Sequence, residues 1–392
     1  MTEDGIEALL TDEHGEPRYV SRYLLLKLAQ RCNIACTYCY WFRDPSVYEK
    51  PALLTEEAET ALLARLGQHV DRFQLKSFFI LLHGGEPTLI GKDRFRRLVS
   101  SLREVEESHG FELKLAITTN GILVDREWAE MFARFSVGVT LSIDGPEAVH
   151  DARRIDHRGR GTYKKVISAI TTLREAGVEP GILAVCDPER SPDEMLDLFV
   201  DDLNVGFDIL VPDANHDDAP PSIAAYYMRL FDRWYDRYAS EKVRIRFIDS
   251  IVKGLLGYPS ESESIGYGPV TTTTMLTDGS LEPLDVLRAT RTNITKTDLN
   301  IQTNSLQDIQ TDPVWREILY ASLNLAAVCR SCPFELSCGG GHVASRWSSK
   351  NRFDNPSVYC DDFKAILGHA WERMRPDLFV QTEQQLIPLM EA

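Results

Sequence analysis

The stretch "YLLLKLAQRCNIACTYCYW" (residues 23–41) joins a short apolar run to three closely spaced cysteines. Its first seven residues, 23–29, are nearly all apolar, which is typical of a strand that is buried on both faces. Cys32, Cys36 and Cys39 follow at C-x3-C-x2-C spacing and use three of the eight cysteines in the chain. In a reducing compartment, three thiols in one loop indicate a metal site or redox chemistry rather than disulfides.

The first 240 residues alternate short apolar runs with longer amphipathic segments. The apolar runs that follow 23–29 predict strands at 77–83, 113–119, 136–143, 180–186 and 206–212. The amphipathic segments predict helices at about 55–70, 92–107, 125–135, 162–176 and 222–240. Because strands and helices alternate in this way in parallel β/α units, we expect an α/β fold, a partial (β/α)6 barrel of the TIM type. The three cysteines directly follow the first strand, where such barrels carry their active sites.

The alternation ends near residue 240 and gives way to turn-rich and polar stretches. The segment "TDGSLEPLD" (277–285) predicts a hairpin, and a second group of cysteines begins at Cys329. We therefore expect five parts: an N-terminal extension (1–20), a core barrel (21–240), a bridging segment with the hairpin (241–325), a small cysteine-bearing domain (326–370) and a C-terminal helix or tail (371–392).

Composition and charge narrow the class of protein. The chain of 392 residues carries a net charge of −16, which disfavours nucleic acid and anionic membranes as partners. It contains no apolar run long enough to span a bilayer. The N-terminal "MTEDGIEALLTDEHGEP" (1–17) is acidic and lacks the basic and apolar regions of a signal peptide. We therefore expect a cytoplasmic protein with reduced thiols.

The cysteine loop after the first strand, with an aromatic residue at Tyr38, resembles that of the radical S-adenosylmethionine (SAM) superfamily. Three cysteine ligands leave one iron of a 4Fe–4S cluster without a protein ligand. The resemblance implies that the amino and carboxylate groups of SAM bind this iron. It also implies that reductive cleavage of SAM gives a 5′-deoxyadenosyl radical, which removes a hydrogen atom from the substrate. A zinc loop or a set of redox thiols is the alternative.

Four further motifs follow predicted strands: "HGGEP" (83–87), "TTNG" (118–121), "SIDGP" (142–146) and "HDARR" (150–154). The resemblance implies that they surround SAM. The residues that it places there are Gly84, Gly85 and Glu86 for the amino group, Asn120 in the pocket, Ser142 at the ribose or carboxylate, Asp144 to orient the loop, Arg154 at the carboxylate, and Tyr38 of the cysteine loop. A planar guanidinium suits a carboxylate because it donates two parallel hydrogen bonds. Each of these residues could equally be an ordinary turn or surface residue.

The second group of cysteines comprises Cys329, Cys332, Cys338 and Cys360. Four thiolates can close a second 4Fe–4S cluster without a vacancy, and they can also bind tetrahedral zinc. The spacing resembles the SPASM extension of peptide-modifying radical SAM enzymes such as the anaerobic sulfatase-maturating enzymes.

The chain departs from the full SPASM pattern, which has seven cysteines and two auxiliary clusters. His342 and Leu284 stand where two of the cysteines are expected, so the resemblance implies that one auxiliary cluster is lost. We expect His342 to pack or to form hydrogen bonds rather than to bind iron. Cys186, at the end of the fifth predicted strand, is expected to be a small buried residue.

Asp285 directly follows Leu284. The resemblance implies that an aspartate at this position lies near the substrate and acts as a base; the alternative is a solvated aspartate in a turn. The segments "CGGGHVASRW" (338–347) and "FDNPSVYC" (353–360) are similar to those of FxS-type and related cyclophane-forming maturases. Those enzymes join an aromatic ring carbon to the β-carbon of a residue two positions along in a ribosomal precursor peptide.

The resemblance therefore implies a peptide cross-linking enzyme that uses SAM and two 4Fe–4S clusters. Its expected partners are the precursor peptide and a reduced flavodoxin or ferredoxin-type electron donor. Since about twenty residues precede the first strand, we expect the leader peptide to be bound by the catalytic body or by a separate recognition protein. Alternatives are a radical SAM oxidase, epimerase or thioether-forming enzyme acting on a peptide or small molecule, and a zinc-stabilised binding protein.

Overall fold

The computed structural model describes residues 10–260 and 262–390, with side chains up to residue 378. The chain forms two compact units. The first consists of the chain up to residue 184 together with 269–321, and the second of 185–268 together with the chain from 322 onward. This division differs from the predicted domains, since 185–240 belongs to the second unit. Residues 1–9 of the predicted N-terminal extension lie outside the described residues.

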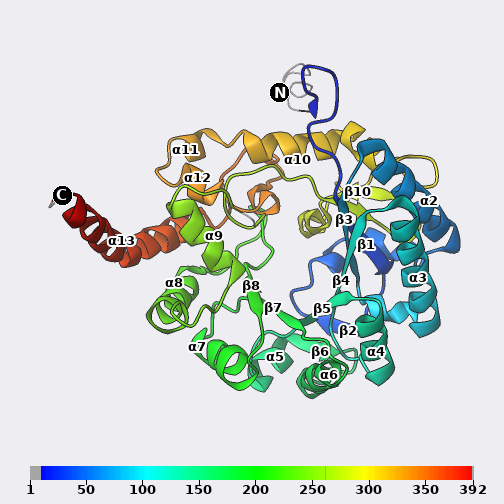
Figure 1. Ribbon diagram of the computed structural model, residues 1–392, viewed down its shortest axis with the longest axis horizontal. Helices are drawn as coiled ribbons and strands as arrows, with labels where there is room; N and C mark the ends of the chain where they lie inside the picture. Colours follow the sequence, from blue (N-terminus) through cyan, green and yellow to red (C-terminus); the bar gives the residue numbers. More distant parts are fainter. Residues whose placement is uncertain (1–9, 261, 391–392) are drawn as a thin grey trace. The chain divides into compact units, whose positions relative to one another are not determined.

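A mostly parallel sheet forms the centre of the first unit (Figure 1). Its strands follow the order β10–β9–β1–β3–β4–β5–β7, and β1, β3, β4, β5 and β7 run parallel to their neighbours. The strands are β1 (Tyr23–Ala29), β3 (Ser77–Gly84), β4 (Glu112–Thr119), β5 (Val137–Ser142), β7 (Gly181–Val185), β9 (Thr273–Met275) and β10 (Leu281–Pro283). The expected α/β fold is therefore confirmed, and the predicted strands are all present.

The predicted hairpin is present as β9 and β10, but it does more than bridge two parts of the chain. β9 pairs in parallel with β1, with Thr274 beside Leu25 and Met275 beside Leu26. This pairing was not predictable, because a three-residue strand has too short a pattern to reveal its neighbour. Asp285, two residues after β10, lies within reach of β1, since Lys27 Nζ on β1 is 2.6 Å from its Oδ2.

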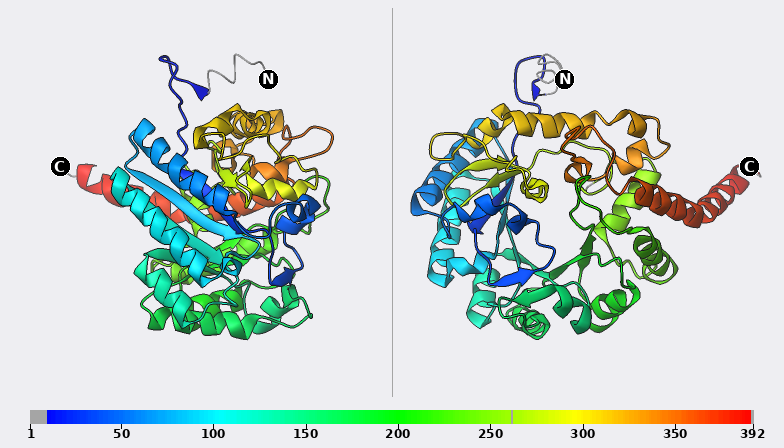
Figure 2. Two further views of the ribbon diagram at one scale, coloured as in Figure 1. Left: turned by 90° about the vertical axis from the view of Figure 1, so that its right-hand side faces the viewer. Right: turned by 180° about the vertical axis from the view of Figure 1, so that it is seen from behind.

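Helices of the first unit lie along the outer side of these strands, as Figures 1 and 2 show for α2, α3 and α4. Their bounds are α2 (Glu56–Phe73), α3 (Lys92–His109), α4 (Arg126–Arg134), α5 (Glu147–Arg153), α6 (Tyr163–Glu175) and α10 (Pro313–Leu323). The Asp125 side chain caps α4 by accepting a hydrogen bond from Trp128 N. Phe95 of α3 packs edge-on against Trp128 and Phe132 of α4, so these helices share an apolar interface.

The second unit carries the sixth predicted strand and the second group of cysteines. Its elements are β8 (Phe207–Leu210), α7 (Asp193–Leu196), α8 (Ala224–Arg233), α9 (Arg246–Leu255), α11 (Ala327–Arg330), α12 (Glu335–Cys338) and α13 (Cys360–Met390). Gly254 of α9 lies so close to α12 that a Cβ there would be 2.9 Å from the Ser337 Cα. Asp362 of α13 accepts hydrogen bonds from Ile223 N and Ala224 N at the start of α8.

The helix predicted for the last residues exists, but it begins much earlier, at Cys360. The side chains beyond residue 378 lie outside the described residues, so its expected amphipathic pattern is not tested there. Among the residues that were searched, none of the helices combines the length and apolar character that crossing a membrane requires.

Candidate functional site

A small second sheet anchors the three-cysteine loop in the first unit. β2 (Ile34–Cys36) pairs antiparallel with β6 (Arg154–Asp156), and Cys36 lies opposite Arg154. The "HDARR" motif is thereby held beside the cysteines, although more than a hundred residues separate them in the chain. Cys39 N donates to Cys36 O over 3.3 Å, which closes the turn between these two cysteines.

The three thiols of this loop are close enough to influence one another electrostatically. Burial, assisted by the Glu86 carboxylate, raises the pKa of Cys32 to about 12. Burial also raises the pKa of Cys36 to about 11, while Arg154 acts in the opposite direction with its Nη1 3.8 Å from the Cys36 Sγ. Asn120 Nδ2 lies 3.7 Å from the Cys32 Sγ. A group of thiols with a cation and an amide donor at its edge fits a cluster held by three thiolates.

The two glycines of the "HGGEP" motif lie directly against the backbone that leads into the cysteine loop. A Cβ on Gly84 would be 2.4 Å from Ala29 O, and a Cβ on Gly85 would be 2.4 Å from Arg31 O. Gly85 N donates to Ala29 O and Glu86 N donates to Arg31 O. Glycine is therefore required here because any side chain would separate the motif from the loop that it supports.

Glu86 is buried and joins the motifs that follow β3 and β4. Its Oε1 accepts hydrogen bonds from Thr88 N, Thr88 Oγ1 and Thr119 Oγ1, and its Oε2 accepts one from Asn120 N over 2.8 Å. Burial raises the pKa of the carboxyl group, and these donors oppose that effect. Three of these hydrogen bonds go to Oε1 and one to Oε2, so Oε2 is the oxygen with more capacity left for an ammonium group.

Tyr38, Asp144 and Arg154 form a compact group beside Cys36. The Tyr38 hydroxyl donates to Asp144 Oδ2 over 2.6 Å, and Arg154 Nε donates to the same oxygen over 3.0 Å. The guanidinium carbon of Arg153 lies 4.2 Å from the centre of the Tyr38 ring. Asp144 thus fixes the direction of the Arg154 side chain. Ser142 is half-buried at the end of β5, two residues before Asp144 in the chain.

Arg154→Lys is expected to weaken SAM binding although the charge is kept. A lysine ammonium cannot hold Asp144 and donate a parallel pair of hydrogen bonds to a carboxylate at the same time. Loss of one charge-assisted hydrogen bond costs about 1.5–3 kcal/mol, or roughly ten- to a hundredfold in the dissociation constant. Anaerobic calorimetric titration of SAM measures this change. Arg158→Lys, at an exposed position four residues further on, is the control, and an unchanged dissociation constant for Arg154→Lys would remove Arg154 from the SAM site.

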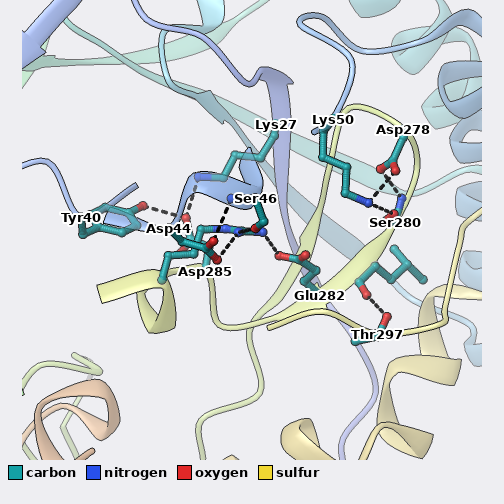
Figure 3. A network of polar contacts seen from close by, with 12 residues as sticks. Lys27, Tyr40, Asp44, Ser46, Lys50, Asp278, Ser280, Glu282, Asp285 and Thr297 are labelled. Atoms are coloured by element: carbon teal, nitrogen blue, oxygen red, sulfur yellow. Dashed lines mark hydrogen bonds and ion pairs between the residues drawn. The ribbon is translucent and has the colours of Figure 1, made fainter. Parts of the chain in front are cut away.

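Asp285 lies in a buried polar network that includes Tyr40, which directly follows the three-cysteine loop (Figure 3). Lys27 Nζ, on β1, lies 2.6 Å from Asp285 Oδ2, and the Tyr40 hydroxyl donates to the same oxygen over 2.7 Å. Lys27 also lies 3.3 Å from His83 Nδ1 and 3.9 Å from the centre of the Trp41 ring. The alternative of a solvated aspartate in a turn is wrong, because Asp285 is only 5% exposed.

The network holds Asp285 as an anion. Burial alone would raise the pKa of Asp285, but the Lys27 ammonium, with His83 and Tyr40, lowers it to about 2. Burial next to Lys27 lowers the pKa of His83 to about 4, so this imidazole is neutral at pH 7. Sequence reasoning missed Lys27, Tyr40 and His83. A single lysine inside the apolar run 23–29 was the available signal, since an unpaired lysine is almost never fully buried.

Lys27→Met is expected to destabilise the protein by about 3–5 kcal/mol, because it leaves the Asp285 carboxylate buried without its cation. The folded-state pKa of Asp285 lies below its ordinary value, so the ion pair is fully formed at neutral pH and is lost only as the pH falls towards about 2. Chemical denaturation of the iron-free protein at pH 7 measures the effect. The double variant Lys27→Met/Asp285→Asn should recover most of the lost stability. A double variant as unstable as the single one would show that packing, not charge, is the cause.

A second buried ion-pair network lies next to the first one (Figure 3). Arg288 donates to Asp44 Oδ2 over 2.8 Å and to Glu282, and its guanidinium stacks over the Trp41 ring. Leu284, where the SPASM pattern has a cysteine, is buried. In this chain the hairpin is therefore tied to the loop after Cys39 by ion pairs.

The second group of cysteines lies at the ends of short helices in the second unit. Cys329 is in α11, Cys332 follows it, Cys338 ends α12 and Cys360 begins α13. All four line one pocket. Burial raises the pKa of Cys338 to about 12 and also raises the pKa values of Cys329 and Cys360. Thiols that surround a common space fit a cubane cluster, in which each thiolate binds a different iron.

Three other observations concern metal ligands. Within the part of the chain that was searched, no group of three or more His, Cys, Asp or Glu side chains is arranged to hold a single metal ion, whereas the thiolates of a 4Fe–4S cluster each bind a different iron. His342 is not among the described residues that line the four-cysteine pocket. Cys186 is buried, as expected, and its backbone N donates to Leu210 O.

Comparison with known proteins finds similarity to one enzyme superfamily. Residues 26–201 match the family model of the radical SAM superfamily. A cysteine-type anaerobic sulfatase-maturating enzyme of Clostridium perfringens is 26% identical over 372 residues, which cover 90% of this chain and 96% of the relative.

Two solved structures have a similar fold. The structure of anSMEcpe with bound AdoMet and the Cp18Cys peptide superimposes with a TM-score of 0.78 at 24% identity, covering 90% of this chain and 98% of that one. Streptococcus suis SuiB bound to the precursor peptide SuiA superimposes with a TM-score of 0.61 at 17% identity, covering 87% of this chain and 76% of that one.

Proposed function

We propose that the chain binds SAM at a 4Fe–4S cluster, as the match of residues 26–201 to the radical SAM family model supports, and that it modifies a ribosomal precursor peptide by joining an aromatic ring to a nearby β-carbon. The observation that supports the proposal most strongly is the presence of two cysteine groups with different numbers of thiols. One group offers three thiols beside the Arg154 guanidinium and the Asn120 amide, and the other offers four thiols around one pocket. The first leaves an iron for SAM, whereas the second leaves none.

Similarity to enzymes that act on peptides supports the choice of substrate. The relative from Clostridium perfringens is named as a sulfatase-maturating enzyme and matches nearly its whole length. Both structural neighbours described above were solved with peptides bound. The cyclophane bond itself rests on the likeness of the C-terminal segments 338–347 and 353–360 to cyclophane-forming maturases.

The residues of the chain divide the work as follows. Cys32, Cys36 and Cys39 would hold the SAM-binding cluster, and the second group of cysteines would hold an auxiliary one. When bound, these groups supply a 5′-deoxyadenosyl radical for hydrogen abstraction and an acceptor for one electron. Glu86 Oε2 is proposed to accept a hydrogen bond from the SAM amino group. Arg154, held in place by Asp144, is proposed to bind the SAM carboxylate.

The cross-linking reaction must remove two hydrogens from the peptide. One leaves as a hydrogen atom from the β-carbon, and the carbon radical then attacks the aromatic ring. Recovery of the aromatic ring releases one proton and one electron. Asp285 is proposed to accept this proton, directly or through Tyr40, whose hydroxyl donates to it. With a pKa of about 2, the Asp285 carboxylate is ionised at neutral pH and can accept a proton. Because it is a weak base, the proton must then pass on to solvent.

Product mass tests the proposed function. The enzyme, SAM, a reduced flavodoxin and a synthetic peptide containing Phe-X-Ser should yield a peptide that is two hydrogens lighter. An oxidase that forms an unsaturated bond would give the same mass, so fragmentation must show that the ring and the β-carbon stay joined. An epimerase would leave the mass unchanged. A peptide without its leader that reacts as well as the full precursor would argue against leader recognition, whether by the catalytic body or by a separate protein.

A further inference from the structure

Arg346 is a buried cation in the second unit, only 3% exposed. Its guanidinium is surrounded by backbone carbonyl groups. Nε donates to Gly340 O over 3.1 Å, and Nη2 donates to Gly341 O over 2.9 Å and to Gly339 O. Carbonyl oxygens replace part of the water that a guanidinium loses on burial.

The three glycines of "CGGG" give the backbone the shape that this arrangement needs. Gly339, Gly340 and Gly341 have φ values of 59°, 75° and 71°, a region that residues with side chains rarely adopt. A Cβ on Gly340 would lie 3.0 Å from the Arg346 Cζ. The segment therefore wraps its carbonyl groups around the guanidinium, and it starts directly after the ligand candidate Cys338.

Arg346 lies close enough to two of the four thiols to interact with them. Burial lowers the pKa of Arg346 to about 10, while Cys329 and Cys338 act in the opposite direction, so the guanidinium remains charged at neutral pH. Gly340, whose carbonyl accepts from Arg346, lines the same pocket as the four cysteines. A charge in a buried position is poorly screened, and its effect on a neighbouring charged group is correspondingly large.

We propose that Arg346 is the fixed positive charge that stabilises the one-electron-reduced state of the cluster at Cys329, Cys332, Cys338 and Cys360, and so raises its reduction potential. Reduction adds one electron and no proton, so the cluster with its four thiolates gains one unit of negative charge. Net charge and hydrogen bonding around the sulfur atoms are the factors that set such potentials. The inference rests on the auxiliary cluster of the proposed function, in which the substrate radical supplies the electron.

The reduction potential of this cluster tests the inference. In the full-length chain with Cys32, Cys36 and Cys39 replaced by Ala, only the auxiliary cluster should remain, and an EPR-monitored redox titration then reports on it alone. Adding Arg346→Met should disfavour reduction at least tenfold, a shift of about 59 mV to lower potential for a one-electron couple. Lys350→Met is the matched control. It removes an exposed positive charge that does not line the four-cysteine pocket, so solvent screening should make its shift several times smaller.

Arg346→Lys distinguishes the effect of the positive charge from the effect of the hydrogen bonds that the guanidinium donates to the loop. A potential close to that of the parent in Arg346→Lys, with a lowered one in Arg346→Met, supports the inference, as does a cluster that assembles with Lys but not with Met. An unshifted potential in Arg346→Met would overturn it, as would loss of the cluster in both variants, since the guanidinium would then only brace the loop. A parent triple variant that binds no iron would instead refute the auxiliary cluster itself, and the inference with it.

Discussion

Replacing Cys32, Cys36 and Cys39 together by Ala is expected to abolish SAM cleavage and to halve the bound iron. The reconstituted parent should contain about eight irons and eight sulfides per chain, because seven cysteines complete one open and one closed cubane. The triple variant should retain about four of each in the second unit. Cys32, Cys36 and Cys39 all belong to the first unit, so their replacement should leave the fold of the second unit intact.

Iron analysis and the yield of 5′-deoxyadenosine under dithionite measure this pair of effects. Cys186→Ala is the matched control, since it removes a buried cysteine that lines neither site and should keep all the iron. SAM cleavage by the triple variant would show that the open cluster lies elsewhere. Zinc in place of iron, in an anaerobically prepared and colourless protein, would favour the binding protein that the sequence left open as an alternative.

Asp285→Asn is expected to uncouple hydrogen abstraction from cross-linking. Abstraction needs no base, so 5′-deoxyadenosine should still form in the presence of the peptide. The cross-linked product should fall by about 10²–10⁴-fold, the usual contribution of a positioned general base. Comparing the yields of 5′-deoxyadenosine and of the lighter peptide gives the coupling ratio directly.

The buried ion pair dictates the control for this experiment. Asp285→Asn leaves the Lys27 ammonium buried without its anion, so the variant is also expected to lose stability. Lys27→Met/Asp285→Asn removes both charges and should restore stability without restoring the product. If the double variant cross-links at the normal rate, the proton leaves by another route. If both products vanish together in both variants, Asp285 positions the peptide, and the base must be sought elsewhere.

The parts of the fold with a strong period were predictable from the sequence. Apolar runs at 23–29, 77–83 and 113–119 correspond to β1, β3 and β4 almost residue for residue. Buried parallel strands give continuous apolar runs, and the intervening amphipathic helices separate them clearly. The pairing of β9 with β1 was not predictable, because a three-residue strand carries no period and its partner lies about 250 residues earlier.

The candidate site likewise has a part that was predictable from the sequence and a part that was not. Close spacing in the chain pointed to the first cysteine group and to Cys329, Cys332 and Cys338, whereas Cys360 lies 22 residues after Cys338 and was added through the resemblance. The contacts that tie the motifs together depend on long-range packing instead. Asp144 with Arg154 and Tyr38 is one case, and Lys27 with Asp285 is another. The sequence predicted that the Glu86 carboxylate faces the cofactor. In the structure it accepts hydrogen bonds from Thr119 and Asn120, which link the segment after β3 to the end of β4.

The most direct test of the central claim follows a label from the peptide into the cofactor product. A synthetic Phe-X-Ser peptide deuterated at the serine β-carbon is incubated with the enzyme, SAM and a reductant. We expect one deuterium in 5′-deoxyadenosine and a peptide that has lost one deuterium and one ring hydrogen, with the ring and the β-carbon joined. Unlabelled 5′-deoxyadenosine, or a peptide of unchanged composition, would contradict it.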